Sequence, residues 1–172
     1  MIDLKEKIRN IPDFPVKGIQ FKDITTLLKD RKAFKYSIDE ITKYCSKYQI
    51  DYIAGIEARG FIIGAPVAYQ LGVGFLPIRK AEKLPSEVER VSYQLEYGEN
   101  ILEMHKDAIN NGDKVMVVDD LLATGGTTAA VFKLIKKLGG KVIGASFVIE
   151  LKFLNPRKKL EGYHIFSLVQ YD

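Results

Sequence analysis

Apolar and polar positions alternate along this chain of 172 residues in two distinct rhythms. Short runs of β-branched and other apolar residues are typical of strands, and apolar residues at helical spacing are typical of amphipathic helices. The runs predict strands over 52–56, 75–78, 115–119, 141–150 and 163–169. The helical spacing predicts helices over 5–11, 33–48, 61–71 and 129–138. Pro66 lies inside the third of these helices and predicts a kink or a later start there, because proline interrupts backbone hydrogen bonding.

Strands and helices follow one another in a way that is typical of an α/β fold, with a mostly parallel sheet flanked by helices. The whole chain, 1–172, is predicted to be a single domain, because this length suffices for one core. Residues 12–18 are irregular by composition, and 79–91 is a charged stretch that is predicted to be a mobile loop. Open α/β sheets bind ligands beyond the carboxyl ends of their strands, so motifs that follow strands are expected to form one site.

Composition narrows the class of protein. No apolar run reaches the roughly 18 residues that a membrane-spanning helix needs, and the N-terminus lacks the apolar core of a signal peptide. The one cysteine, Cys45, is interpreted as a structural residue in a reducing compartment, so a cytoplasmic protein is expected. The net charge of +4 is spread along the chain, which a cleft for a polyanionic small molecule explains as well as a nucleic-acid surface does. His105 and His164 lack partners at metal-ligand spacing.

The segment 115–128 carries the most chemical information. Asp119 and Asp120 come at the end of a buried strand, and a turn rich in glycine and threonine then opens into a helix. Gly125 and Gly126 permit a tight turn and a close approach to a ligand. Free amides at the start of the helix suit a phosphate, and the two carboxylates suit the hydroxyls of a ribose. The segment therefore predicts a sugar-phosphate site, whereas the nucleotide motif G-x-x-x-x-G-K-[ST] is absent from the chain.

This segment, V-V-D-D-L-L-A-T-G-G-T, closely resembles the phosphoribosyl-pyrophosphate motif of type I phosphoribosyltransferases, in the form found in adenine phosphoribosyltransferases. Further segments resemble the same family in the expected order, among them G-I-E-A-R-G-F at 55–61, I-R-K-A-E-K-L-P at 78–85, S-Y-Q-L-E-Y-G at 92–98 and V-I-E-L at 148–151. Residues 12–25 resemble the N-terminal hood that covers the base in this family. The resemblance extends from Ile11 to Gln170 and implies a type I phosphoribosyltransferase fold with a small N-terminal hood.

The resemblance also implies roles for individual residues. It places phosphoribosyl pyrophosphate or AMP against Asp119, Asp120, Ala123, Thr124, Gly125, Gly126 and Thr127. It places pyrophosphate against Ala58, Arg59, Gly60, Arg79, Lys80 and Lys83, some of them across a dimer interface. It places adenine against Ile19, Phe21, Lys22 and Leu151. It assigns the proton transfer near the base to Glu96, on a mobile loop over about 79–98, and it forms the hood from about 10–30 with the C-terminal region.

One residue departs from the family pattern. Many relatives carry arginine where this chain has Lys22. If only the backbone amide of this residue meets the base, the departure leaves the preference for adenine intact. If a guanidinium is needed for stacking or for a bidentate contact, the preference is open, because lysine cannot replace arginine in either role.

The implied activity is adenine phosphoribosyl transfer in purine salvage. The 5-phosphoribosyl group of phosphoribosyl pyrophosphate would pass to N9 of adenine and give AMP and pyrophosphate. Mg²⁺ is expected on the phosphoribosyl pyrophosphate or pyrophosphate, without a direct protein ligand. The implied partners are these small molecules and a second copy of the chain in a homodimer, with no nucleic acid and no membrane.

Two alternatives stay open at this point. One is a phosphoribosyltransferase for hypoxanthine, guanine or xanthine, although such enzymes usually carry a loop that ends D-T-G, where this chain has Ala123-Thr124-Gly125. The other is a non-enzymatic regulator that keeps the fold and its ligand motif. A repressor of that kind normally needs an added DNA-binding segment, for which the 172 residues are expected to leave no room.

Overall fold

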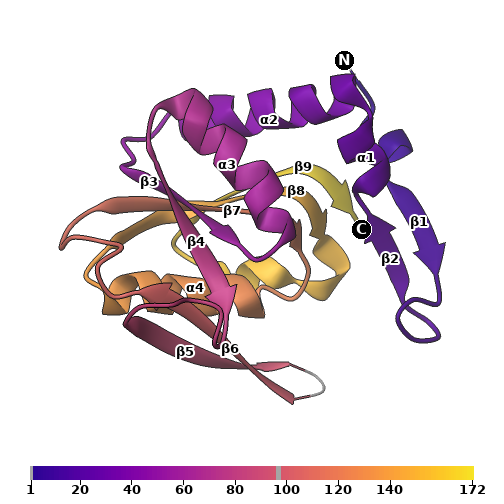
Figure 1. The fold of residues 1–172 in the computed structure, drawn as a ribbon. Helices are drawn as coiled ribbons and strands as arrows, with labels where there is room; N and C mark the ends of the chain where they lie inside the picture. Colours follow the sequence, from indigo (N-terminus) through magenta and orange to yellow (C-terminus); the bar gives the residue numbers. More distant parts are fainter. Residues whose placement is uncertain (1, 96–97) are drawn as a thin grey trace.

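The computed structural model describes residues 2–95 and 98–172 and contains one central seven-stranded sheet (Figure 1). Its strands are β3 (Tyr52–Ile56), β4 (Gly74–Lys80), β5 (Val88–Leu95), β6 (Gly98–His105), β7 (Lys114–Leu122), β8 (Lys141–Leu151) and β9 (His164–Tyr171). The strand order is β5-β6-β4-β3-β7-β8-β9. The five strands from β4 to β9 in this order are parallel, and β5 and β6 are antiparallel additions at one edge. The prediction of an α/β fold with a mostly parallel sheet is therefore confirmed.

Helices cover both faces of this sheet (Figure 1). They are α1 (Thr25–Lys29), α2 (Arg31–Cys45), α3 (Arg59–Leu71) and α4 (Gly126–Lys137), with 3₁₀ segments η1 (Lys5–Lys7), η2 (Lys152–Leu154) and η3 (Pro156–Leu160). Helices α2 and α3 pack on one face and α4 on the other, so two separate clusters of buried apolar side chains form the core. Side chains of alternate residues of β7 point into the two clusters. Val117 packs in the cluster with α4, and Val118 packs in the cluster with α3.

The prediction for the N-terminus was wrong. Residues 5–11 form η1 and then β1 (Arg9–Pro12), which pairs antiparallel with β2 (Gln20–Asp23) and places Ile11 opposite Phe21. The apolar spacing of this segment fits a short helix, but its partner strand lies beyond an irregular turn. Pairing across that turn overrides the weak local preference.

The charged stretch 79–91 is also more ordered in secondary structure than predicted. Strand β4 continues to Lys80 and β5 begins at Val88, so the intervening turn is short. Strands β5 and β6 form an antiparallel hairpin that buries Val91 and Leu102 and leaves its other face polar, a pattern that resembles a solvated loop in sequence. The helix predicted over 61–71 is present as α3, which begins at Arg59 and so does not have the later start that Pro66 suggested, and β7 continues beyond Asp119.

The hairpin of β1 and β2 is tied to α1 by Asp23. This side chain is 7% exposed and accepts hydrogen bonds from the Thr25 amide at 2.9 Å, the Thr25 hydroxyl at 2.8 Å and Arg9 Nε at 3.0 Å. The amide of Thr25, together with these other donors, lowers the pKa of Asp23 to about 2. Because the charged form is favoured in the folded chain, the ionised carboxylate stabilises the fold.

Replacing Asp23 with asparagine is expected to lower the free energy of unfolding by about 1–3 kcal/mol at neutral pH, because the ionised partner of Arg9 and Thr25 is lost. The lowered pKa means that the stabilisation is present above the ordinary value of 3.8 and is lost as the pH falls toward about 2. Urea unfolding at pH 7 and at pH 3 measures both effects. The matched control is Asp107→Asn, at an exposed site, which is expected to change stability by less than about 0.5 kcal/mol. Equal losses in both variants would contradict this role.

Candidate active site

The carboxyl ends of four neighbouring parallel strands meet at one edge of the sheet. Ile56 at the end of β3 is in register with Ile78 in β4, and Leu122 at the end of β7 is in register with Glu150 in β8. The segments that follow these strands are 57–60, 79–83, 123–127 and 151–160. The predicted convergence of the strand-end motifs is therefore present in the structure, because the strand order β4-β3-β7-β8 places their ends side by side.

Arg59 connects three parts of this edge. It is the first residue of α3, and the Glu57–Ala58 peptide bond before it is cis. Its Nε lies 2.7 Å from Oδ2 of Asp120, and its guanidinium carbon lies 5.6 Å from the ring centroid of Phe21. The guanidinium therefore occupies a face of the Phe21 ring and at the same time neutralises a carboxylate on β7.

Asp119 and Asp120 form a closely coupled acidic pair within β7. Asp120 is 4% exposed, and its amide donates a hydrogen bond to Oδ1 of Asp119 at 2.9 Å. Burial raises the pKa of Asp119 well above its ordinary value, with the charge of Asp120 as the second cause. Burial also raises the pKa of Asp120, and the charge of Arg59 opposes this shift.

The acidic pair has unused capacity to accept hydrogen bonds. Arg59 lies within ion-pair distance of Asp120, but the direction of its N–H does not make a hydrogen bond, so Oδ2 has no hydrogen-bond partner among the described residues. A buried acceptor without a donor is costly. Gly60 packs directly against this pair, since a Cβ at that position would lie 2.7 Å from Oδ1 of Asp119. Hydroxyl groups of a ligand are suitable donors for this pair.

The turn before α4 has the geometry of an anion site. Gly125 has a φ of +76°, and α4 begins at Gly126. The amide of Ala129 is bonded to the Gly125 carbonyl at 3.0 Å, so the amides of Gly126, Thr127 and Thr128 precede the first helical hydrogen bond. These N–H groups and the positive end of the helix dipole favour a phosphate at this point.

A second cluster of charges lies at the ends of β3 and β4. Oε2 of Glu57 accepts hydrogen bonds from Arg79 Nε at 3.0 Å and from the Lys80 amide at 3.1 Å, and Arg79 also donates to the Lys83 carbonyl at 3.2 Å. The bond from Arg79 lowers the pKa of Glu57. Lys80 and Lys83 are exposed, whereas Arg79 is held in place. Sequence reasoning missed Glu57 as a residue that orients this cluster, although Glu57 stands within the G-I-E-A-R-G-F segment.

The structure shows where the side chain of Lys22 lies. Successive residues of a strand point to opposite faces, so Lys22 points away from the side where Phe21 meets Arg59. Its Nζ donates a hydrogen bond to Asn10 Oδ1 at 2.8 Å and lies 4.3 Å from the ring centroid of Tyr171. On the Phe21 side, this residue therefore presents its backbone rather than its side chain.

Ile19 and Leu151, the other residues expected at the base, have different surroundings. The Ile19 amide donates to the Val16 carbonyl at 3.2 Å, and the Ile19 carbonyl accepts from the Phe14 amide at 3.3 Å. Only the second lone pair of that carbonyl is free for a ligand. Leu151 is half-buried at the end of β8, and its place opposite Phe21 remains a prediction. Glu96 and its neighbour Tyr97 lie outside the described residues.

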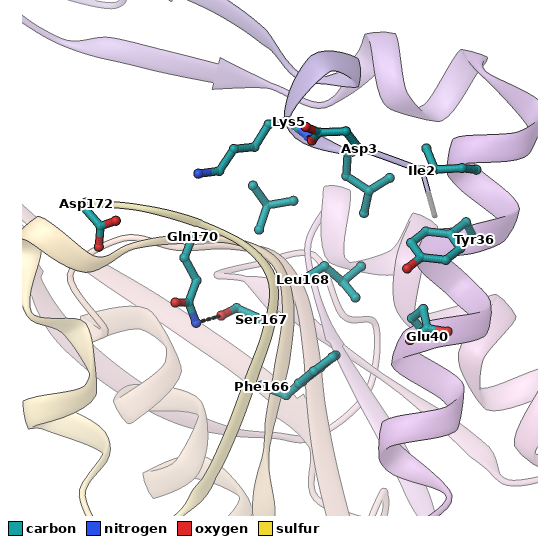
Figure 2. A pocket seen from close by; sticks show the side chains of 12 residues that line it. Ile2, Asp3, Lys5, Tyr36, Glu40, Phe166, Ser167, Leu168, Gln170 and Asp172 are labelled. Carbon is teal, nitrogen blue, oxygen red and sulfur yellow. Dashed lines mark hydrogen bonds between the residues drawn. The ribbon is translucent and has the colours of Figure 1, made fainter.

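A separate open groove of about 780 Å³ lies between the N-terminal segment, α2 and β9 (Figure 2). Tyr36, Phe166 and Leu168 form its apolar part, and Asp3 and Glu40 add negative charge. None of the residues expected to bind substrate lines this groove. It is therefore distinct from the strand-end site.

The described residues contain no group of three or more His, Cys, Asp or Glu side chains arranged to hold a metal ion. Within the same residues, no helix combines the length and the apolar character that crossing a membrane requires. Cys45 is fully buried beside Ser146, and burial raises the pKa of its thiol to about 11. This environment agrees with the interpretation of Cys45 as a structural residue.

Comparison with known proteins gives consistent results. The sequence profile of the phosphoribosyl transferase domain matches residues 25–168. The chain is 54% identical to the adenine phosphoribosyltransferase of Clostridium kluyveri over 171 residues, which is 99% of each chain. It is similar to the crystal structure of adenine phosphoribosyltransferase from Thermoanaerobacter pseudethanolicus, with a TM-score of 0.95, 56% identity and 98% of each chain covered. The Saccharomyces cerevisiae enzyme, solved with adenine and an imino-altritol bisphosphate, matches with a TM-score of 0.90, 40% identity and 96% coverage of each chain.

The two glycines of the turn are expected to respond differently to alanine. Gly125 combines its positive φ with a close neighbour, because a Cβ there would lie 2.6 Å from the Pro156 carbonyl oxygen. Gly125→Ala should therefore lower the free energy of unfolding by about 1–2 kcal/mol or more. A Cβ on Gly126 would lie 3.6 Å from its nearest atom, Oγ1 of Thr124, which is an ordinary contact. Gly126→Ala should therefore keep the free energy of unfolding within about 1 kcal/mol of the wild type. Thermal unfolding of both variants tests this, and an equally destabilised Gly126→Ala would contradict the assignment.

Proposed function

Because the chain belongs to the phosphoribosyltransferase family, we infer that it is an adenine phosphoribosyltransferase with the type I fold of that family. It transfers the 5-phosphoribosyl group of phosphoribosyl pyrophosphate to N9 of adenine and gives AMP and pyrophosphate, a reaction of purine salvage. One observation carries this conclusion. A phosphate turn, an acidic pair and an aromatic ring lie together at one sheet edge, in a chain that matches named adenine phosphoribosyltransferases along 99% of its length.

The phosphoribosyl group is held by two neighbouring features. The turn from Ala123 to Thr127 supplies backbone amides and threonine hydroxyls to the 5-phosphate. Asp119 and Asp120 accept hydrogen bonds from the ribose hydroxyls, which supplies the donor that Oδ2 of Asp120 lacks. Gly60 lets the loop after β3 lie directly against this pair.

The leaving pyrophosphate is met by cations. Oxocarbenium character develops at C1 of the ribose as pyrophosphate departs, so stabilising the departing negative charge lowers the barrier. Arg79 is held at the end of β4 by Glu57, and Lys80 and Lys83 are exposed and able to close on the anion. Ala58 and Gly60 supply backbone groups from the neighbouring loop. No protein nucleophile is required for this step.

Arg59 changes partner in this scheme. In the structure, its guanidinium covers Phe21 and pairs with Asp120. Pyrophosphate is a stronger partner for a guanidinium, because it carries a higher charge than a single carboxylate. When Arg59 turns to pyrophosphate, the ring of Phe21 becomes free for adenine and Asp120 becomes free for the ribose.

Adenine lies between Phe21 and Leu151, with backbone groups of Ile19 and Lys22 at its edge. The direction of the Lys22 side chain supports a backbone role, so the arginine-to-lysine departure leaves the preference for adenine intact. As N9 of adenine attacks C1 of the ribose, N9 gives up its proton, and Glu96 is the residue proposed to accept it. This assignment depends on the S-Y-Q-L-E-Y-G segment alone.

Mg²⁺ is the proposed cofactor. Among the described residues at this edge, Asp119 and Asp120 offer carboxylate oxygens, and Mg²⁺ commonly binds through substrate phosphates and water, so the residues fit an ion that arrives with its substrate and needs no direct protein ligand. When bound, it neutralises charge on the pyrophosphate.

We further propose a homodimer in the cytoplasm. The exposed side chains of Ile62 and Tyr69, seven residues apart on one face of α3, support a contact with a second chain.

Product analysis tests the proposed function directly. With phosphoribosyl pyrophosphate and Mg²⁺, adenine should give AMP, and hypoxanthine, guanine and xanthine should react with kcat/KM values lower by roughly 10²-fold or more, because buried polar groups reject a base whose edge does not match. Chromatography of the nucleotide products measures each rate. Comparable rates with hypoxanthine or guanine would overturn the base assignment, and the absence of any nucleotide product would favour a regulator.

Glu96→Gln is expected to lower kcat by roughly 10²–10⁴, because glutamine keeps the size of the side chain but cannot exchange a proton. The KM for phosphoribosyl pyrophosphate should stay near the wild-type value, since Glu96 is assigned to the base. Glu99→Gln is the matched control, with the same charge outside the assigned position, and should be nearly silent. Single-turnover kinetics separates chemistry from product release. Near wild-type turnover in Glu96→Gln, or a large loss in Glu99→Gln, would contradict the assignment.

A further inference from the structure

Lys159, which belongs to none of the sequence motifs, lies beside the turn at 123–127 that precedes α4. A Cβ on Gly126 would lie 3.6 Å from Oγ1 of Thr124 and 4.0 Å from Nζ of Lys159. The missing Cβ of Gly126 therefore leaves a small open space bordered by a hydroxyl and an ammonium. Both groups are hydrogen-bond donors, and the amides at the start of α4 border the same turn.

The segment that carries Lys159 is fixed on both sides. Arg157 donates two hydrogen bonds to the buried Glu150, at 2.7 Å from Nε to Oε1 and 2.7 Å from Nη2 to Oε2. Ser167 also donates to Glu150, and Gln170 in turn donates to Ser167 at 3.1 Å (Figure 2). This network ties η3 to β8 and β9.

The other side of the segment is held by packing. Leu160 is 1% exposed and belongs to the apolar cluster under α4, and Pro156 is buried. The Pro156 carbonyl lies so close to Gly125 that no Cβ fits between them. Because η3 is fixed against the turn, the main chain at Lys159 has a defined place beside the start of α4.

A phosphate at the start of α4 carries more negative charge than the helix start alone can balance. A phosphate monoester carries a charge of about −1.5 to −2 at neutral pH, and a helix start offers only about half of one positive charge. Lys159 forms no ion pair among the described residues, so its ammonium is available to supply the remaining charge. An oxygen bonded to the amides of the turn lies within reach of a lysine on this flexible stem.

We propose that Lys159 is a further phosphate-binding residue, whose ammonium contacts the 5-phosphate of phosphoribosyl pyrophosphate and of AMP at the open face of Gly126. This proposal rests on the proposed function, which places that phosphate in the turn. Lys159 thereby adds the segment after β8 to the phosphate site, which the sequence motif alone confines to 119–127.

The neighbouring Lys158 provides a matched control. It has the same charge and is also exposed on η3, but it lines a different depression with Glu150 and Asn155. Equilibrium binding of AMP and of adenosine is measured by calorimetry for the wild type, Lys159→Gln, Lys159→Arg and Lys158→Gln. Adenosine lacks only the phosphate, so the ratio of the two Kd values isolates the phosphate contact from any general change of structure.

Lys159→Gln should weaken AMP binding by about tenfold, because a charge-assisted hydrogen bond is lost, and should leave adenosine binding unchanged. Lys159→Arg should keep most of the AMP affinity, and Lys158→Gln should bind both ligands within about twofold of the wild type. Equal losses for AMP and adenosine, equal losses in both glutamine variants, or no loss would overturn the role of Lys159. If the wild type itself bound AMP no more tightly than adenosine, the assignment of the turn at 123–127 to the 5-phosphate would be overturned as well as the role of Lys159.

Discussion

Parallel pairing of the four strands β4, β3, β7 and β8 is the constraint on which the site depends. Their carboxyl ends reach the same edge, so segments from distant parts of the chain meet there. Arg59 follows β3, Arg79 lies near the end of β4, and Asp120 lies near the end of β7. None of these residues is close to another in sequence. A shift in register of one residue would move every side chain of a strand to the opposite face, so the two buried clusters that fix the register also fix the site.

Close approach of backbone segments is the second requirement. Gly60 brings the loop after β3 against Asp119, and Gly125 brings the phosphate turn against Pro156. In both places a Cβ would lie within 2.7 Å of an oxygen atom. The glycines therefore serve packing within the protein as well as the approach of a ligand. This explains how a loop with few apolar side chains keeps a defined shape.

Charge balance within the site is the third requirement. Asp119 and Asp120 are placed together where burial raises the pKa of each, and Arg59 offsets part of that cost. Arg79 in turn is held by Glu57. Each of these charged groups has a protein partner that a substrate can replace with a hydroxyl or a phosphate. These partners fix the charged groups at the edge of the sheet where the substrate binds.

Local sequence determined the alternation of strands and helices, the phosphate turn and the acidic pair, because apolar spacing and glycine placement act over a few residues. It also identified most candidate site residues through motifs such as G-I-E-A-R-G-F. Tertiary structure alone decided the β1–β2 hairpin, the direction of the Lys22 side chain toward Asn10 and Tyr171, the contact of Arg59 with Phe21, and the approach of Lys159 to Gly126. These features join residues that the order of strands brings together, and no local preference encodes that order.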